Sequence, residues 1–189
     1  MVVGLGTGST AKHMVMALGD KVRAGMRLRG VPTSQETAAL ARQSGIPLID
    51  AENRWEIDVA IDGADQVDPR FNLIKGGGGA LLKEKIVAAS AKQFIVLVDH
   101  TKQVSVLGGS FPLPIEVIPF GWGSTAREIE KLTKSPVVLR ERKGAPFKTE
   151  AGNLIVDVHL QRIDQLVAHT RTLVAQRRIR RCRCLATFA

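Results

Sequence analysis

Short, continuous apolar runs alternate with longer segments of mixed polarity along the first half of the chain. Such runs, bounded by turn residues, are typical of strands buried on both faces of a parallel sheet. Strands that alternate with helices predict an α/β fold, with an open, mostly parallel sheet flanked by helices. The predicted strands are Val2–Leu5, Arg27–Val31, Ile57–Ile61 and Phe94–Val98.

Three helices are predicted between these strands. One begins after Thr10 and another lies near residues 80–91, and in both the apolar residues recur with the spacing of a single helix face. Residues 33–44 show the same pattern more weakly. The apolar positions are Ala11, Met14, Val15 and Leu18 in the first helix, and Leu82, Ile86 and Ala89 in the helix near residues 80–91.

Glycines and prolines interrupt this alternation between residues 108 and 120, and we place a domain boundary there. The predicted organisation is a Rossmann-like α/β domain over residues 1–112, which carries the site, and a smaller α+β, ferredoxin-like domain over residues 113–176. A segment near residues 154–176 could return to the first domain. Residues 177–189 form a basic tail.

The smaller domain has helix and strand signals of its own. Thr125 and Glu128 have the spacing of a capping box, which predicts a helix that runs from there to about Thr133. Two strands and a last helix are predicted after it, at Val137–Arg140, Leu154–Leu160 and residues 161–176.

The formal net charge of +9 raises the question of a nucleic-acid partner. Most of that excess is local, because residues 161–189 hold seven arginines against one acid, Asp164. Nucleic-acid sites usually add stacking aromatics or a recognisable module, whereas this chain has no tyrosine and only 4% aromatic residues. No apolar run approaches the roughly 20 residues of a membrane helix. We therefore expect a cytoplasmic protein that binds neither nucleic acid nor membranes.

Metal and nucleophile signals are weak. Cys182 and Cys184 lack the paired spacing of a zinc site, and the histidines show no metal spacing. Reduced thiols without a structural role are the favoured interpretation, and no metal is expected.

A glycine-rich turn, Gly4-Leu-Gly-Thr-Gly-Ser-Thr10, joins the first strand to the first helix. Glycine lets backbone approach a ligand closely, and a helix N-terminus favours an anion. The dinucleotide fingerprint would need glycine in place of Ser9, and the lysine of a Walker loop is missing. A tight turn with Ser9 or Thr10 capping the helix is the alternative interpretation.

Two more polar clusters follow predicted strands, at the edge where α/β sheets bind ligands. The Asp62-Gly-Ala-Asp65 turn brings two carboxylates close together, which can split their pKa values. Lys75 precedes four glycines whose entropic cost suggests that backbone lies against a ligand, and its cation could stabilise an oxyanion. Simple turn formation and a flexible linker are the respective alternatives.

Glu84 and Lys102 are the remaining candidates. From the pattern alone, Glu84 between Lys83 and Lys85 favours a solvated charge run, and a lysine after a strand is usually solvated. An anion cradle, paired carboxylates, a lysine and a glutamate fit proton abstraction next to the carbonyl of a phosphorylated substrate. Residue types alone do not name the substrate.

At these positions the sequence resembles ribose-5-phosphate isomerase of the A type. The agreement covers about residues 2–160, and the motifs keep the family's order and spacing. The matching runs are Gly6–Thr10, Thr33-Ser34, Asp62–Asp65, Ile74–Ala80, Glu84-Lys85, Lys102–Val104, Phe111–Val117 and Asn153–Asp157.

The resemblance implies an aldose-ketose isomerase of the non-oxidative pentose phosphate pathway, which interconverts D-ribose 5-phosphate and D-ribulose 5-phosphate through an enediolate. Glu84 would be the catalytic base, Asp62 would assist ring opening and proton transfer, and Lys75 would steady the oxyanion. The resemblance further implies a homodimer or homotetramer without metal or organic cofactor. The implied substrate-binding residues are Thr7, Gly8, Ser9, Thr10, Ser34, Asp62, Gly63, Ala64, Asp65, Lys75, Gly76, Gly77, Gly78 and Lys102.

Both ends depart from the family pattern. Met1 directly precedes the first strand, where family members have a helix, and the arginine-rich segment from Arg177 stands in place of closing strands. We therefore expect a truncated second domain. A catalytically impaired isomerase, a sugar-phosphate sensor and a relative of acyl-CoA transferases are the alternatives. The sensor would need neither Glu84 nor Asp62, so the presence of both favours an enzyme.

Overall fold

The computed structural model describes residues 1–163 except 51 and 53. The chain divides into two compact units, the first made of Met1–Gly63 and Lys83–Asp99, the second of Ala64–Leu82 and the chain from His100 on. Residues 64–82 and 100–112, which the sequence analysis placed in the first domain, thus belong to the second unit. The basic tail, and the predicted last helix from residue 164 on, lie outside the described residues.

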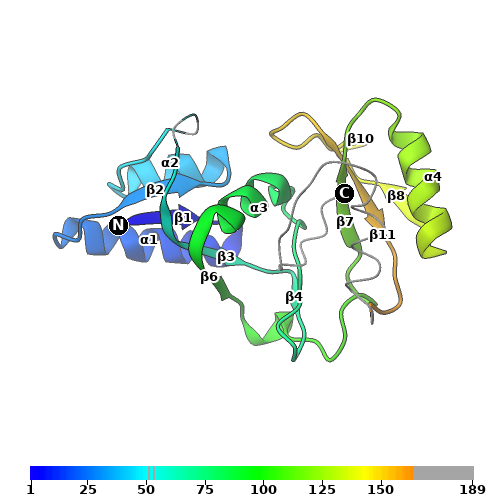
Figure 1. The fold of residues 1–189 in the computed structure, drawn as a ribbon, viewed down its shortest axis with the longest axis horizontal. Helices are drawn as coiled ribbons and strands as arrows, with labels where there is room; N and C mark the ends of the chain where they lie inside the picture. Colours follow the sequence, from blue (N-terminus) through cyan, green and yellow to red (C-terminus); the bar gives the residue numbers. More distant parts are fainter. Residues whose placement is uncertain (51, 53, 164–189) are drawn as a thin grey trace. The chain divides into compact units, whose positions relative to one another are not determined.

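The first unit is a parallel four-stranded sheet with helices on both faces (Figure 1). The strand order is β2-β1-β3-β6, with all pairs parallel, which confirms the predicted α/β class. The strands are β1 (Val2–Leu5), β2 (Arg29–Pro32), β3 (Ile57–Gly63) and β6 (Ala91–Leu97), and the helices are α1 (Ser9–Arg23), α2 (Gln35–Gln43) and α3 (Leu81–Ser90).

Two apolar clusters hold the helices on this sheet. Val15 of α1 and Ala41 of α2 pack with Val3 and Leu5 of β1. Val87 of α3 packs in a second cluster with residues of β2 and β3. Burial of such side chains contributes about 1.5–3 kcal/mol each, so the sheet is fixed from both faces.

The predicted inward face of α3 is wrong. Leu81 and Val87 are buried, whereas Ile86, expected in the core, is 46% exposed. Apolar residues occur on more than one side of this helix, so the sequence does not determine which side faces the sheet. The side with Val87 faces it, and the fit is close: a Cβ on Gly4 would lie 2.5 Å from Val87 Cγ1. Glu84 lies on the buried stripe, three residues from both Leu81 and Val87.

The second unit is built around an antiparallel three-stranded sheet of order β7-β11-β8 with a helix on one face. Two short hairpins and a 3₁₀ turn are its further elements in the part of the chain that the structure describes. The elements are β4 (Gln66–Val67), β5 (Leu73–Ile74), η1 (His100–Lys102), β7 (Leu113–Val117), α4 (Trp122–Thr133), β8 (Val137–Leu139), β9 (Glu141–Arg142), β10 (Ala145–Pro146) and β11 (Leu154–Val158).

Three expectations for this unit are corrected. Strand β7 lies where the sequence suggested a boundary, and it tolerates Pro114 because it pairs only with β11 at the edge of the sheet. Helix α4 begins at Trp122 with the left-handed Gly121 (φ 72°) as N-cap, so Thr125 lies inside the helix and does not cap it. Residues 154–158 pair with β7 and β8 and do not return to the parallel sheet.

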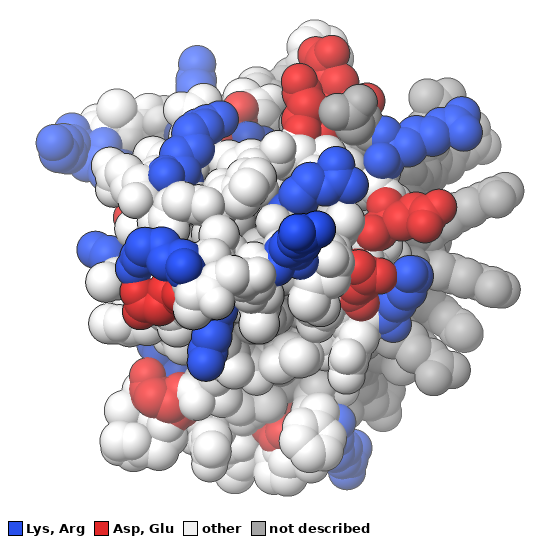
Figure 2. All heavy atoms as spheres, turned by 90° about the vertical axis from the view of Figure 1, so that its left-hand side faces the viewer, with Lys and Arg blue, Asp and Glu red and all other residues white. Residues whose placement is uncertain are grey.

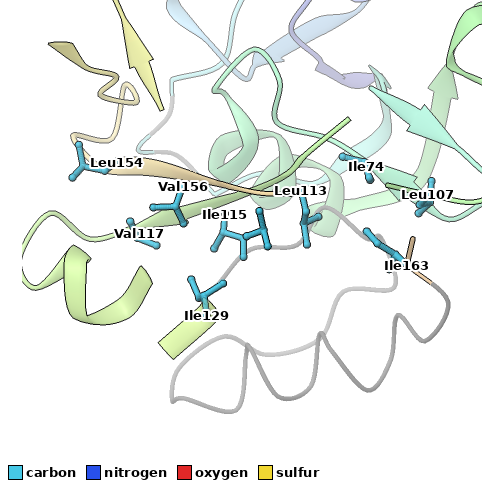
Figure 3. Packing of buried hydrophobic residues seen from close by; sticks show 10 residues of the cluster. Ile74, Leu107, Leu113, Ile115, Val117, Ile129, Leu154, Val156 and Ile163 are labelled. Atoms are coloured by element: carbon cyan, nitrogen blue, oxygen red, sulfur yellow. The ribbon is translucent and has the colours of Figure 1, made fainter. Parts of the chain in front are cut away.

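Side chains alternate across this small sheet and give it two different faces. One face packs its apolar side chains against Ile129 of α4 (Figure 3). The opposite face carries Pro114 and Asp157, which are partners in the ladder, and Ile155, which is two residues from Asp157 along β11. Ile155 packs there with Leu81 and Phe147. The side chains of the α4 face are Leu113, Ile115, Val117, Leu154, Val156 and Val158.

Charged side chains of both signs are interspersed on the face of the molecule shown in Figure 2. Lys92 Nζ of β6 lies 2.9 Å from Oδ1 of Asp58 on the neighbouring strand β3. The hydrogen bond from Lys92 lowers the pKa of Asp58 below its ordinary value, and the bond from the Val2 N–H adds to this. Within the described residues, no helix has the length and apolar character needed to cross a membrane.

Candidate functional site

Thr7 lies in a cluster of hydroxyl groups at the carboxyl ends of β1 and β2. Its Oγ1 lies 2.7 Å from Thr33 Oγ1 and 3.1 Å from Thr37 Oγ1, and it donates to Ser34 Oγ at 2.8 Å. Ser34 in turn donates to Thr37, and Thr37 donates to the Gly6 carbonyl. The hydroxyl of Ser34 also accepts from the Thr37 N–H as the N-cap of α2. This network fixes the rotamer of Thr7.

Asp62, at the end of β3, meets the turn that follows β1. The residue is 3% exposed, and its Oδ1 accepts hydrogen bonds from Gly63 N (2.7 Å) and Thr7 N (3.2 Å). Glycine is required at position 6, because a Cβ there would lie 2.1 Å from Asp62 Oδ1. The structure therefore brings the first and second predicted clusters together through Asp62.

The N-terminus of α1 is open to a ligand. Gly8 is the N-cap, with φ 110°, and no side chain of the described residues caps the helix. The alternative in which Ser9 or Thr10 caps the helix is therefore wrong; Ser9 is exposed and Thr10 is half-buried. The first N–H groups of a 15-residue helix, with the positive end of its dipole, are suited to an anion.

In the second unit, the hairpin of β4 and β5 places Asp65 beside the glycine loop Gly76–Gly79. The Asp65 N–H donates to the Ile74 carbonyl at 2.7 Å, and Asp65 Oδ2 accepts from the Gly77 N–H at 2.8 Å. Lys75, between β5 and this loop, is buried. Gly79 N–H closes the loop onto the Gly76 carbonyl at 3.1 Å. These hydrogen bonds hold the loop in a defined conformation. The flexible-linker interpretation is therefore wrong.

Glu84 occupies the first turn of α3 and is 6% exposed, so the solvated charge run favoured by the pattern is wrong. Lys102 lies half-buried in the 3₁₀ turn after β6. Gly63 and Ala64, also expected to bind substrate, are half-buried at the end of β3 and just beyond it. Among the described residues, no group of three or more His, Cys, Asp or Glu side chains could hold a metal ion.

Thr33, Thr37 and Arg140 were missed as site residues. The two threonines stand beside Ser34, which was recognised, and their hydroxyl groups at the start of a predicted helix were the available signal. Arg140 donates to the carbonyl groups of Gly76 and Gly77, and no local sequence pattern predicts that contact.

Comparison with known proteins identifies the family. The sequence model of ribose 5-phosphate isomerase A (phosphoriboisomerase A) matches residues 29–177. The chain belongs to the ribose 5-phosphate isomerase A family. It is 53% identical over 169 residues to ribose-5-phosphate isomerase A of Rhodopseudomonas palustris, covering 86% of this chain and 72% of that protein. The corresponding protein of Thermomicrobium roseum is 52% identical over 159 residues, covering 84% of this chain and 67% of its own length.

Solved structures of the family share the fold. A D-ribose-5-phosphate isomerase in complex with phospho-erythronic acid has a TM-score of 0.87 and 42% identity, over 93% of this chain and 78% of that one. Ribose 5-phosphate isomerase A of Methanocaldococcus jannaschii has a TM-score of 0.87 and 40% identity, over 93% and 79% of the two chains. The resemblance noted in the sequence is thus confirmed, and family membership supports aldose-ketose isomerisation of ribose 5-phosphate.

Proposed function

We propose that this chain interconverts D-ribose 5-phosphate and D-ribulose 5-phosphate, with Glu84 as the catalytic base. The observation that carries the proposal is the burial of Glu84 on the inward stripe of α3, between Leu81 and Val87. Acidic side chains are almost never this buried without a specific partner, so the burial of this carboxylate calls for a functional explanation. Glu84 is also the residue to which the family resemblance gives the role of catalytic base.

The reaction needs a proton moved between neighbouring carbons. Glu84 takes the proton from C2 of the open-chain aldose, the electrons form the enediolate, and the same carboxyl returns the proton to C1. Asp62 assists ring opening and moves the hydroxyl proton from O2 to O1, while Lys75 offsets the negative charge of the enediolate oxygen. No step calls for a metal or organic cofactor.

Substrate binding in this proposal uses the N-terminus of α1 and the glycine loop Gly76–Gly79. The open N-terminus of α1, with Thr7 to Thr10, takes the phosphate, as helix N-termini commonly do. The glycine loop, Asp65 and Lys102 contact the sugar. A cytoplasmic homodimer or homotetramer acting in the pentose phosphate pathway, without nucleic-acid partners, completes the proposal.

The purified 189-residue chain is expected to form ribulose 5-phosphate from ribose 5-phosphate, and EDTA is expected to leave the rate unchanged. A coupled or direct absorbance assay measures both. If the folded chain binds phospho-erythronic acid but shows no turnover, the proposal of an active isomerase fails. A sugar-phosphate sensor or an impaired isomerase would then be the better interpretation. Inhibition by EDTA that added metal reverses would contradict the metal-free mechanism.

Gly78→Ala tests whether the glycine loop faces a ligand. A Cβ at this exposed position meets nothing within 4 Å among residues 1–163 as described, and no positive φ requires glycine, so the fold of these residues gives no reason for it. We expect an unchanged melting temperature but roughly tenfold weaker binding of phospho-erythronic acid, since a methyl group would hold the ligand off the backbone. Calorimetric titration measures the affinity. Gly123→Ala, equally unhindered but on α4, is the matched control. Equal affinities in the two variants would remove Gly78 from the site.

A further inference from the structure

Arg140 holds the glycine loop of the second unit by its carbonyl groups. Its Nη1 donates to the carbonyl oxygens of Gly76 at 2.8 Å and of Gly77 at 3.1 Å. The other side of the guanidinium is taken by Asp157, which accepts from Nε at 2.8 Å and also from Nη2. One side chain therefore connects a loop and a strand that lie far apart in the sequence.

These bonds determine which way the loop's amides point. In a trans peptide the C=O and N–H point in opposite directions. The peptide that joins Gly76 to Gly77 is held at both ends, its carbonyl by Arg140 and its N–H by Asp65. The next peptide has its carbonyl on Arg140 as well, so the Gly78 N–H is directed away from the guanidinium, at an exposed residue with open space beside it.

Arg140 is itself held in place by the sheet. Its N–H donates to the Ile155 carbonyl at 2.8 Å, and its carbonyl accepts from the Phe147 N–H at 2.8 Å. Its partner Asp157 lies opposite Val138, two residues before Arg140, so both charged side chains share one face of the sheet. The backbone is thereby fixed before the side chain reaches the loop.

Stability alone does not account for this ion pair. The Arg140 and Asp157 side chains are 14% and 16% exposed, and well-packed apolar residues often replace buried ion pairs at no cost in stability. A guanidinium, however, supplies several donors in a rigid, planar fork, which a lysine ammonium does not reproduce. The arrangement uses that fork to hold two adjacent carbonyl groups and a carboxylate at once.

We propose that Arg140 is a positioning residue, oriented by Asp157, which presents the Gly78 N–H to the oxygen that becomes negative during isomerisation. The inference rests on the proposed function for the identity of that oxygen. The orientation of the loop amides stands on the hydrogen bonds alone. Arg140 itself donates to protein groups and touches no reacting atom in this scheme.

Arg140→Lys keeps the positive charge beside Asp157 but loses the fork, and Arg142→Lys is the matched control in the same part of the chain. Arg142 is exposed, and its guanidinium lies 4.9 Å from the centre of the Phe147 ring. We expect Arg140→Lys to fold with a similar melting temperature and to lose tenfold or more in kcat, with KM changed less than threefold. Arg142→Lys is expected to match the parent chain in both constants.

The amide signals of Gly77 and Gly78 supply a readout that turnover does not affect. We expect phospho-erythronic acid to shift the Gly78 amide in the parent chain and in Arg142→Lys, but not in Arg140→Lys. Asp157→Asn is expected to give an intermediate result, because the guanidinium keeps its carbonyl partners. Equal kcat in the two lysine variants, or the same ligand-induced shift in both, would overturn the positioning role. If the parent chain showed no isomerase activity, the proposed function would fail, and the Gly78 shift would still decide the role of Arg140.

Discussion

Glu84→Gln is expected to lower kcat for ribose 5-phosphate by roughly 10²–10⁴-fold, the usual contribution of a general base. Glutamine keeps the length and most of the hydrogen-bonding capacity of glutamate, but its amide cannot accept the C2 proton. Glu84 lies buried at the start of α3, where a side chain of the same shape leaves no cavity. Binding of phospho-erythronic acid should therefore change little.

Isotope exchange separates loss of the base from loss of the site. In D₂O the parent chain should introduce deuterium at the carbon atoms between which the proton moves, and Glu84→Gln should not. Glu128→Gln is the control, since Glu128 is exposed on α4, where it pairs with Lys131 at 2.8 Å. A Glu84→Gln variant with near-parental kcat, or with parental deuterium incorporation, would remove Glu84 from the role of base.

The parallel sheet could be predicted because its strands are continuous apolar runs with polar turns at their ends. Strand β1 matches its predicted bounds, and β3 extends the prediction by two residues, to Gly63. The hairpins β4–β5 and β9–β10 escaped prediction because their strands have only two residues each, too few to show a periodicity. Strand β7 was hidden by prolines that only its edge position makes acceptable.

The candidate site residues could be predicted where charged side chains and turn-forming residues are neighbours in the sequence, as at Asp62 and the glycine loop. It was not predictable where a contact is long-range, since Arg140 and Gly76 are 64 residues apart. Glu84 shows the opposite difficulty. Its flanking lysines favour a solvated surface, and the apolar residues of α3 can be grouped into more than one face, so only tertiary packing reveals its burial.

Gly6→Ala is expected to destabilise the first unit and to inactivate the site in one step. The added Cβ would lie 2.1 Å from Asp62 Oδ1 and 2.6 Å from Asp62 Cα. Overpacking of this kind costs about 1–3 kcal/mol, and displacement of the carboxylate also weakens its hydrogen bonds to backbone N–H groups. A fall of about 3 kcal/mol in the free energy of unfolding corresponds to roughly 10 °C in melting temperature for a chain of this size.

Part of the clash is with the backbone of Asp62, so the prediction tests how closely the chain after β1 approaches the end of β3. Because Asp62 Cα itself lies 2.6 Å from the added methyl group, shortening the side chain does not relieve the clash. The double variant Gly6→Ala/Asp62→Gly should therefore melt no higher than Asp62→Gly alone, as measured by calorimetry. Gly123→Ala, which meets nothing within 4 Å on α4, should melt at or slightly above the parental temperature. If the double variant regained the parental melting temperature, the clash would lie with the carboxylate only, and the strands would not approach as closely as the structure shows.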